Sequence, residues 1–283
     1  MSACNCTTDP LALAVAECTR LLKAENLDAW LSLLLARAAA RPALLGTWAV
    51  VAETARLPWR LHEPLLCRLR MEFWRAAAAG EETPALPGNM AAPLPLLALL
   101  PPALPRDDLA EALAQLALLA DGVFDAADDL LQWSEAAFTP LWRTLLLATS
   151  VERSGAKLVN PPDVQAPGMD AALRALARAF GVGFLLRRAA WPRRSTQAPL
   201  LGGAMAEQET VAALIARARA DFATARAERW PRRLLPALLP ASLMHHWLKR
   251  ARQQPDFPSR PASSPSQPAR QWLLLRRWLA GRL

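Results

Sequence analysis

The chain of 283 residues has no tyrosine, and it has few cysteines, histidines and lysines. Valine and isoleucine are also sparse. These two residues and tyrosine are the ones that favour strands, so we do not expect a sheet-based fold. Leucine and alanine are abundant in a composition that is 53% hydrophobic, and both are strong helix formers. The composition therefore predicts an all-α fold with a sizeable core.

The four cysteines give little sign of a metal centre. Cys4 and Cys6 form a lone C-x-C with no second pair and no histidine nearby. We expect reduced thiols in a cytoplasmic protein, with metal binding as the alternative. The sequence also contains no glycine-rich phosphate loop, no Ser-x-Gly elbow and no zinc-ligand spacing, so it carries no familiar catalytic motif.

Two short clusters consist of residue types that can bind a metal ion. Asp125 and Asp129 are four residues apart and would face the same way on a helix, where they could hold a metal. We favour the alternative, that they are acids at the positive N-terminal end of the next helix. His245 and His246 are adjacent, so on a helix they point about 100° apart and cannot chelate one ion together. The sequence therefore predicts no metal site.

Acidic residues are missing between Asp170 and Glu207, whereas six arginines fall in this gap. Residues 1–173 carry 13 basic and 20 acidic groups, and residues 174–283 carry 20 and 5, which gives net charges of −7 and +15. Such asymmetry suggests an anionic partner, namely a lipid surface, a diphosphate, an acidic protein or a nucleic acid, or else a solvated arginine-rich surface. Because no nucleic-acid-binding module is recognisable, we expect no nucleic-acid partner.

Apolar periodicity predicts helices over 41–57, 65–79, 130–150 and 171–190, arranged around a common centre. Asp9 and Pro10 indicate the start of an earlier helix, and Asp107 or Asp108 would cap another. Glycines in AFGVGFLLRR (179–188) would let a neighbouring helix come close. The uncharged run 83–105 is interrupted by too many prolines to span a membrane, so we expect a loop.

The chain is expected to form one domain. Residues 1–252 make a helical domain, 253–269 a Pro/Ser-rich linker, and 270–283 a C-terminal helix docked on the same domain. The alternative for this last helix is contact with a membrane surface through Trp272 and Trp278.

Several stretches resemble the squalene/phytoene synthase family, whose members share the all-helical isoprenoid synthase fold. RPALLGTWAVVAETAR (41–56) is similar to that family's Arg-then-aliphatic helix, and LRMEFWRAA (69–77) to its IRLQWWRDA stretch. LADGVFD (119–125) is similar to its LIDxxxxD segment, AFGVGFLLRR to A-x-x-L-T-x-[IL]-L-R, and ERWPRRLLPALLPASL (228–243) to its late helices. The resemblance covers about residues 21–283, in the family's order. It implies a single helical bundle around a central cavity.

Catalytic members of the family hold Mg²⁺ on two aspartate-rich motifs, because a hard cation needs oxygen ligands to bridge the protein and a departing diphosphate. By resemblance, the first motif falls on Ala55 and Trp59, and the second on Arg188 and Pro192. All four aspartates are therefore missing. Glu53 and Glu63 are the acids nearest the first motif, and Glu53 is the one to suspect if the alignment slips.

TWAVVAETAR and AFGVGFLLR are closer to a non-catalytic branch of the family, the assembly factors of respiratory complex I and their bacterial relatives, which read roughly LYAFNAELAR and AYGLTGLLR. The resemblance implies a pseudo-synthase without a cofactor. It would act in respiratory complex assembly through a protein partner, or bind an isoprenoid or a membrane surface, at the periphery of the inner membrane. The implied pocket or diphosphate contacts are Arg41, Arg70, Trp74, Arg75, Arg187 and Arg188, with Trp74 buried and Arg70 or Arg75 paired with an acid.

Two other functions stay open. An active, Mg²⁺-dependent prenyl-diphosphate synthase with atypical metal ligands would place two carboxylates across the cavity from each other. An unrelated helical adaptor would need no cavity at all.

Overall fold

A computed structural model describes residues 9–81, 94–152, 154–189, 193–194, 201–254 and 265–283. This part of the chain is all-helical, and it contains no strand beyond the isolated bridges Phe124–Leu201 and Val151–Leu158. The α-helices are α1 (Pro10–Glu25), α2 (Leu27–Leu33), α3 (Arg41–Arg60), α4 (Pro64–Ala79), α5 (Leu94–Leu97), α6 (Asp107–Ala117), α7 (Ala127–Ala148), α8 (Pro167–Ala189), α9 (Gln208–Ala227), α10 (Leu235–Arg252) and α11 (Gln267–Leu279). Short 3₁₀ turns are η1 (Leu118–Ala120), η2 (Gly203–Ala206) and η3 (Arg232–Leu234).

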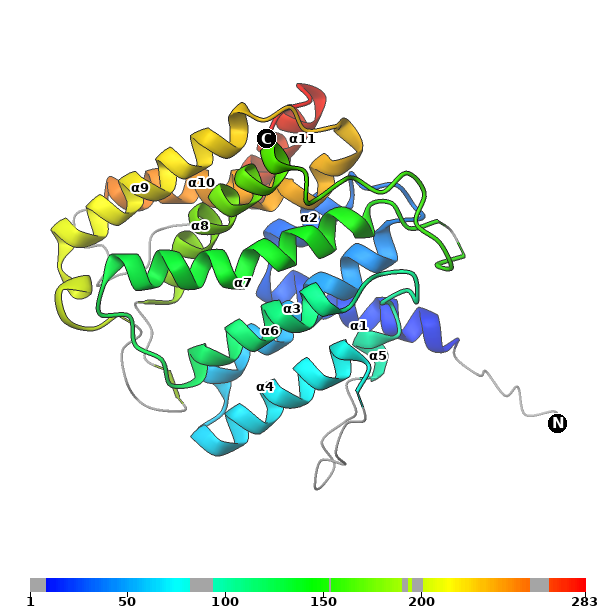
Figure 1. The fold of residues 1–283 in the computed structure, drawn as a ribbon, viewed down its shortest axis with the longest axis horizontal. Helices are drawn as coiled ribbons and strands as arrows, with labels where there is room; N and C mark the ends of the chain where they lie inside the picture. Colours follow the sequence, from blue (N-terminus) through cyan, green and yellow to red (C-terminus); the bar gives the residue numbers. More distant parts are fainter. Residues whose placement is uncertain (1–8, 82–93, 153, 190–192, 195–200, 255–264) are drawn as a thin grey trace.

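The helices form one layered bundle. In Figure 1, α7 and α8 run through the middle, α9, α10 and α11 lie along one edge, and α4 lies at the opposite edge beside α6. The predicted all-α fold is confirmed, and each of the four predicted helices is present. None of the described helices is both long and apolar enough to cross a bilayer.

The centre of the core is a cluster of aromatic rings contributed by α3, α7 and α8. Trp48 meets Trp142 edge-on with ring centroids 5.8 Å apart, and Phe180 lies 5.2 Å from Trp142 and 5.0 Å from Phe138. Edge-to-face pairs of this kind contribute about 0.5–1.5 kcal/mol each beyond the burial of their area. The cluster therefore fixes α8, whose C-terminal half forms the site described below, against α3 and α7.

Two glycines of α8 allow close contact with two other helices, as the sequence predicted. A Cβ at Gly181 would lie 2.4 Å from Cβ of Ser134 on α7, and a Cβ at Gly183 would lie 2.4 Å from Cγ of Met244 on α10. Both distances are far below van der Waals contact. A Cβ at Gly181 would also lie 2.9 Å from Cα of Ser134, so a larger residue there would push α7 away, whereas at Gly183 the Met244 side chain would have to move. Gly181 thus sets the spacing of α7 and α8.

Helix boundaries follow local chemistry, with three corrections. The side chain of Asp9 accepts a hydrogen bond of 3.0 Å from the Leu11 amide and caps α1, as predicted. Asp107 and Asp108, in contrast, lie in the first turn of α6 rather than at its cap. Pro58 does not end α3, which continues to Arg60. A proline in the last turn removes only one backbone hydrogen bond, and the packed core compensates for that loss.

The third correction concerns the proline-rich run 83–105, of which residues 83–93 lie outside the described part. The remainder is more ordered than the expected loop: α5 forms, and leucines of this segment enter the core beside α1 and α3. They are Leu96, Leu99, Leu100 and Leu104.

Helix α11 docks on the bundle through one face and is exposed on the other. Leu274 is buried, and α11 lies against α10 and α2. Trp272, in contrast, is 67% exposed. The helix begins at Gln267, three residues earlier than predicted, which shortens the expected linker at that end.

Candidate binding pocket

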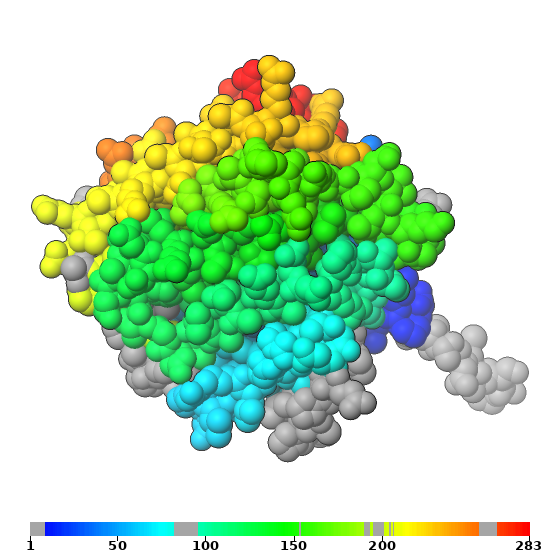
Figure 2. Space-filling model, viewed as in Figure 1, coloured from blue at the N-terminus to red at the C-terminus, as the bar shows by residue number. Residues whose placement is uncertain are grey.

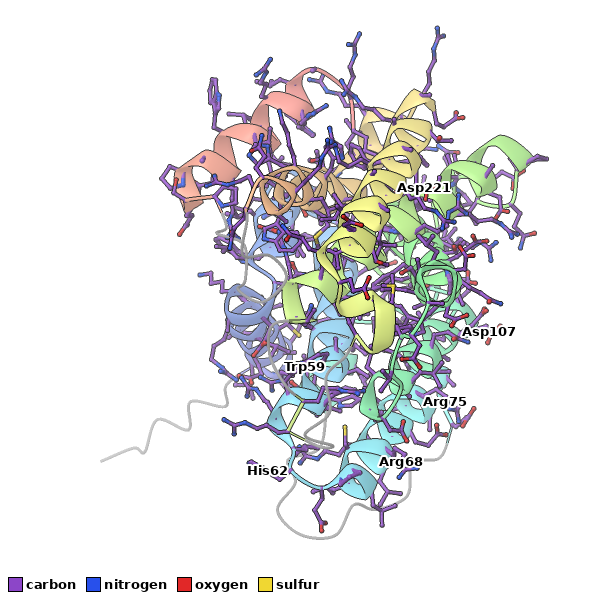
Figure 3. All side chains as sticks on the ribbon, turned by 90° about the vertical axis from the view of Figure 1, so that its left-hand side faces the viewer. Trp59, His62, Arg68, Arg75, Asp107 and Asp221 are labelled. Carbon is purple, nitrogen blue, oxygen red and sulfur yellow. The ribbon has the colours of Figure 1, made fainter. Side chains whose placement is uncertain are left out.

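A pocket of about 360 Å³ opens where the chain between α1 and α2, the end of α3, and helices α8 and α10 meet. Five of its lining residues are apolar, namely Trp59, Phe180, Phe184, Pro240 and Met244. The other five are polar or charged, namely Glu25, Asn26, Asp28, Arg187 and Arg188. Figure 3 labels Trp59, which marks this part of the molecule. The pocket is thus amphipathic.

Both carboxylates of the pocket are bonded to arginines. Asp28, only 5% exposed, accepts hydrogen bonds from Arg187 of α8 at 2.9 Å and from Arg270 of α11 at 2.8 Å. Glu25 accepts from Arg56 at 3.2 Å and from Arg60 at 2.7 Å. Each acid is therefore shared between two guanidinium groups, and neither is free to be a general base or a metal ligand without breaking these bonds.

Arg187 is held in place on two sides. Its guanidinium bonds to Asp28 and lies 5.3 Å from the centroid of the Trp247 ring. Burial lowers the pKa of Arg187, while the charge of Asp28 opposes that shift. This side chain is a fixed part of the pocket wall.

Arg188 has a different environment. It lies over the Phe184 ring at 3.9 Å from the centroid, faces Trp59 at 5.7 Å, and donates one hydrogen bond of 3.2 Å to the carbonyl of Phe184. Within the described residues it has no carboxylate partner. Burial, and next the neighbouring Arg187, lower the pKa of Arg188 to about 10, with Glu25 acting in the opposite sense. The group remains charged at neutral pH, so the pocket contains a cation that forms an ion pair with no carboxylate of the described residues.

Three of the residues singled out in the sequence thus meet at this pocket: Trp59, Arg187 and Arg188. Ala55 is buried one turn before Trp59, and Pro192 lies outside the described residues. Glu53 does not line the pocket, because it pairs with Arg56 on its own helix.

The other implied contact residues have structural surroundings instead. Arg41 donates to the carbonyls of Leu33 at 3.2 Å and Ala36 at 3.2 Å, so it caps the end of α2. Arg41 does not line the pocket with Arg187 and Arg188, but lines a separate cavity of about 270 Å³. Helix α2 ends at Leu33, one of the residues whose carbonyl Arg41 binds.

The residues of α4 lie away from the pocket. Trp74 is buried, as predicted, and meets Phe73 edge-on at 6.2 Å. Arg75 pairs with Glu72 and with Glu81, both at 2.7 Å, which confirms the expected ion pair. Arg70 is on the same helix and does not line the pocket either.

The clusters of possible metal ligands do not form a metal site within the described residues. Asp125 precedes α7 while Asp129 lies inside it, so the two are not on successive turns of one helix, and Asp128 pairs with Arg217 at 2.8 Å. No three His, Cys, Asp or Glu side chains come together in the part of the chain that the structure describes. Cys4 and Cys6 lie outside that part.

The buried thiols and histidines have packing roles. Burial raises the pKa of Cys18 to about 12 and of Cys67 to about 11, so neither is a ready nucleophile. His245 stacks on Phe222 with the ring centroids 4.4 Å apart. Arg193, from the acid-free stretch, is fully buried and donates to the carbonyls of Leu119 and Gly122 at 2.9 and 2.6 Å.

The residues that the sequence analysis missed include Asp28, which lines the pocket, and Arg270, which bonds to Asp28 from α11. One signal for Asp28 was available: it is the only charged residue in the run 27–36, where the rest is apolar apart from one serine. A lone acid in such a run is costly to bury unless a cation meets it. Which of the many arginines does so is decided by tertiary contacts.

Comparison with models of known protein families finds no match, and comparison with curated proteins finds none either.

Proposed function

We propose that this chain is a non-catalytic pseudo-synthase of the squalene/phytoene type whose pocket binds an amphipathic anion. The observation that carries the proposal is Arg188, a charged guanidinium against two aromatic rings with no carboxylate among the described residues. A cation that has lost part of its water and has no counter-ion favours an anionic ligand. Guanidinium groups recognise phosphate oxygens particularly well.

The shape of the pocket suggests the rest of the ligand. Its apolar lining residues suit a hydrocarbon chain, and its arginines suit a phosphate group joined to that chain. A prenyl phosphate or diphosphate has this combination of parts. By resemblance, Trp59 and Arg188 occupy positions of the two aspartate motifs. In this proposal they lie where the hydrocarbon chain of the ligand joins its phosphate, since Arg188 faces the Trp59 ring.

The same residues argue against turnover. Ionising an allylic diphosphate relies on metal ions held by carboxylates, a contribution of several kcal/mol. The two carboxylates at the pocket, Glu25 and Asp28, are each bonded to two arginines. We therefore expect the chain to bind a prenyl diphosphate without converting it. The active prenyltransferase stays the alternative, and the role in respiratory complex assembly with a protein partner stays a prediction from the resemblance.

The test is a calorimetric titration with farnesyl diphosphate, with and without Mg²⁺, combined with a search for condensation products. We expect Mg²⁺-independent binding and no product. Arg188→Gln should weaken binding by about 10-fold or more, since a charge-assisted hydrogen bond contributes about 1.5–3 kcal/mol.

Arg75→Gln is the matched control, because it removes the same charge from an ion-paired site on α4. Equal binding by the Arg188→Gln and Arg75→Gln variants would exclude the proposed site. A squalene- or phytoene-type product formed with Mg²⁺ would establish the active synthase instead.

A further inference from the structure

A second cavity, of about 200 Å³, lies beside α11 and is rich in arginine. It is lined by Leu35, Arg37, Arg232, Arg233, Pro236 and Trp278, and we call it the arginine cavity. Arg37 comes from the segment between α2 and α3, and the other two arginines come from η3. It shares none of its lining residues with the pocket described above.

The three arginines have no carboxylate partner within the described residues. Arg232 lies 4.8 Å from the Trp278 ring centroid and donates to the carbonyl of Leu279 at 3.2 Å. The Nε atom of Arg233 is buried without a hydrogen-bond partner. Glu152 lines an adjoining cavity with Arg37 and Arg233, but its bond is to the Ser154 hydroxyl. Three cations around one small cavity are an anion-binding arrangement.

An exposed apolar stripe lies next to this cavity. Trp272, Leu275 and Leu279 follow one another at i, i+3 and i+7 on α11, and they are 67%, 37% and 57% exposed. Trp278, which lines the arginine cavity, is adjacent to Leu279 on the same helix. The stripe and the cavity therefore belong to one surface.

The surroundings of the stripe are basic. The described residues of 235–254 and 265–283 contain no acid, and their exposed cations are Lys249, Arg250, Arg252, Arg276 and Arg282. Helix α11 is at the edge of the molecule opposite α4, as the red and cyan segments in Figures 1 and 2 show. Nothing in the described part of the chain covers the exposed side of α11.

We propose that α11 and the arginine cavity form a docking surface for an anionic phospholipid membrane. The stripe would enter the interface between headgroups and acyl chains, where tryptophan and leucine of an amphipathic helix are stable. A headgroup phosphate would bind in the arginine cavity, and the basic residues around it would be attracted to the charged surface. A phospholipid provides an apolar layer and a phosphate side by side, as this surface requires. The proposal does not depend on the ligand of the central pocket.

The test is flotation of the full chain with phosphatidylcholine vesicles that contain phosphatidylglycerol, compared with phosphatidylcholine alone. We expect binding to the anionic vesicles only, with a decrease as salt rises. The variants Trp272→Ala/Leu279→Ala and Arg37→Gln/Arg233→Gln should each weaken partitioning by about 10-fold or more.

Each variant has a matched control. Leu65→Ala/Leu69→Ala removes two leucines of α4 that are 64% and 53% exposed. Arg68→Gln/Arg217→Gln lowers the net charge by the same amount, at sites 57% and 55% exposed. Both controls should bind like the parent chain, and thermal melts establish that every variant is folded.

Three results would overturn the proposal. One is that the parent chain does not bind anionic vesicles. Another is that a control loses as much binding as its matched variant, which would mean general attraction of a basic protein. The third is that light scattering shows a dimer that Trp272→Ala/Leu279→Ala dissociates, which would make the stripe a contact between two copies.

Discussion

The two halves of helix α8 carry arginines in opposite settings. In the first half, Arg178 bonds to Glu135 of α7 at 2.6 Å and to Asp221 of α9 at 2.7 Å, so it ties three helices together. In the second half, Arg187 shares one buried acid with α11, and Arg188 has no acid among the described residues. The comparison teaches that arginine content alone does not mark a binding site. Within α8, the pocket lies at the arginine that pairs with no acid of the described residues.

The largest expected effect on the free energy of unfolding comes from replacing Asp28, the buried acid that lines the pocket. Asp28→Asn leaves Arg187 and Arg270 buried without their shared charge, and removing one partner of a buried ion pair costs about 3–5 kcal/mol. Urea denaturation measures the free energy of unfolding. Asp128→Asn is the control, because Asp128 is 83% exposed and should change stability by less than about 0.5 kcal/mol. Equal effects would mean that Asp28 is not an essential link.

The acid-poor part of the molecule should also respond to pH through His245. Burial, and next Arg219, lower the pKa of His245 from 6.5 to about 4. The unfolded chain therefore takes up a proton that the folded chain refuses, and stability is lost as the pH falls from about 6.5 towards 4. The loss should be about 2 kcal/mol after allowance for partial exposure. His245→Phe should remove most of it, and identical melting curves across pH 4–7 for the two proteins would contradict this.

A smaller loss is expected at the paired half of α8. Arg178→Gln removes the hydrogen bonds to Glu135 and Asp221, which should destabilise the chain by about 1–2 kcal/mol, since both acids are partly exposed and can be hydrated. The effect should shrink in high salt, because screening weakens the parent's ion pairs. A salt-independent loss would instead indicate that the packing of the side chain matters.

The smallest change should have the opposite sign. Arg188→Met replaces a charge that has no carboxylate partner with an apolar side chain of similar length, so we expect a gain of up to about 1 kcal/mol. Thermal melts of the Arg188→Met and Arg178→Gln variants compare their changes in stability. A loss as large as that of Arg178→Gln would erase the difference between the two halves of α8.

Features decided by neighbouring residues were predictable from the sequence. They include the helices themselves, the Asp9 cap, and the ion pair of Arg75, whose partners are three and six residues away. The glycines of α8 also indicated close helix contacts, because small residues on an apolar face have few other uses. Each of these depends on local spacing or on the properties of a single residue.

The two ion pairs of Asp28 were not predictable, because they join residues 159 and 242 positions apart. The sequence contains many arginines, and local sequence pattern does not indicate which of them pairs with Asp28. Arg41 shows the same limit: the resemblance implied a diphosphate contact, whereas the fold turns its guanidinium onto the carbonyls of Leu33 and Ala36. Such assignments require the tertiary structure.

The bond from Arg270 to Asp28 has a consequence for synthesis of the protein. At about 5–20 residues per second, a ribosome needs roughly 10–50 s to add the residues that separate the two. Throughout that time α1, α2 and the following helices exist without α11, so the carboxylate of Asp28 has no Arg270 to meet. The bonding of Asp28 is therefore completed only after Arg270 has been added. A nascent chain that ends before α11 has one positive charge fewer beside this carboxylate than a chain that includes α11.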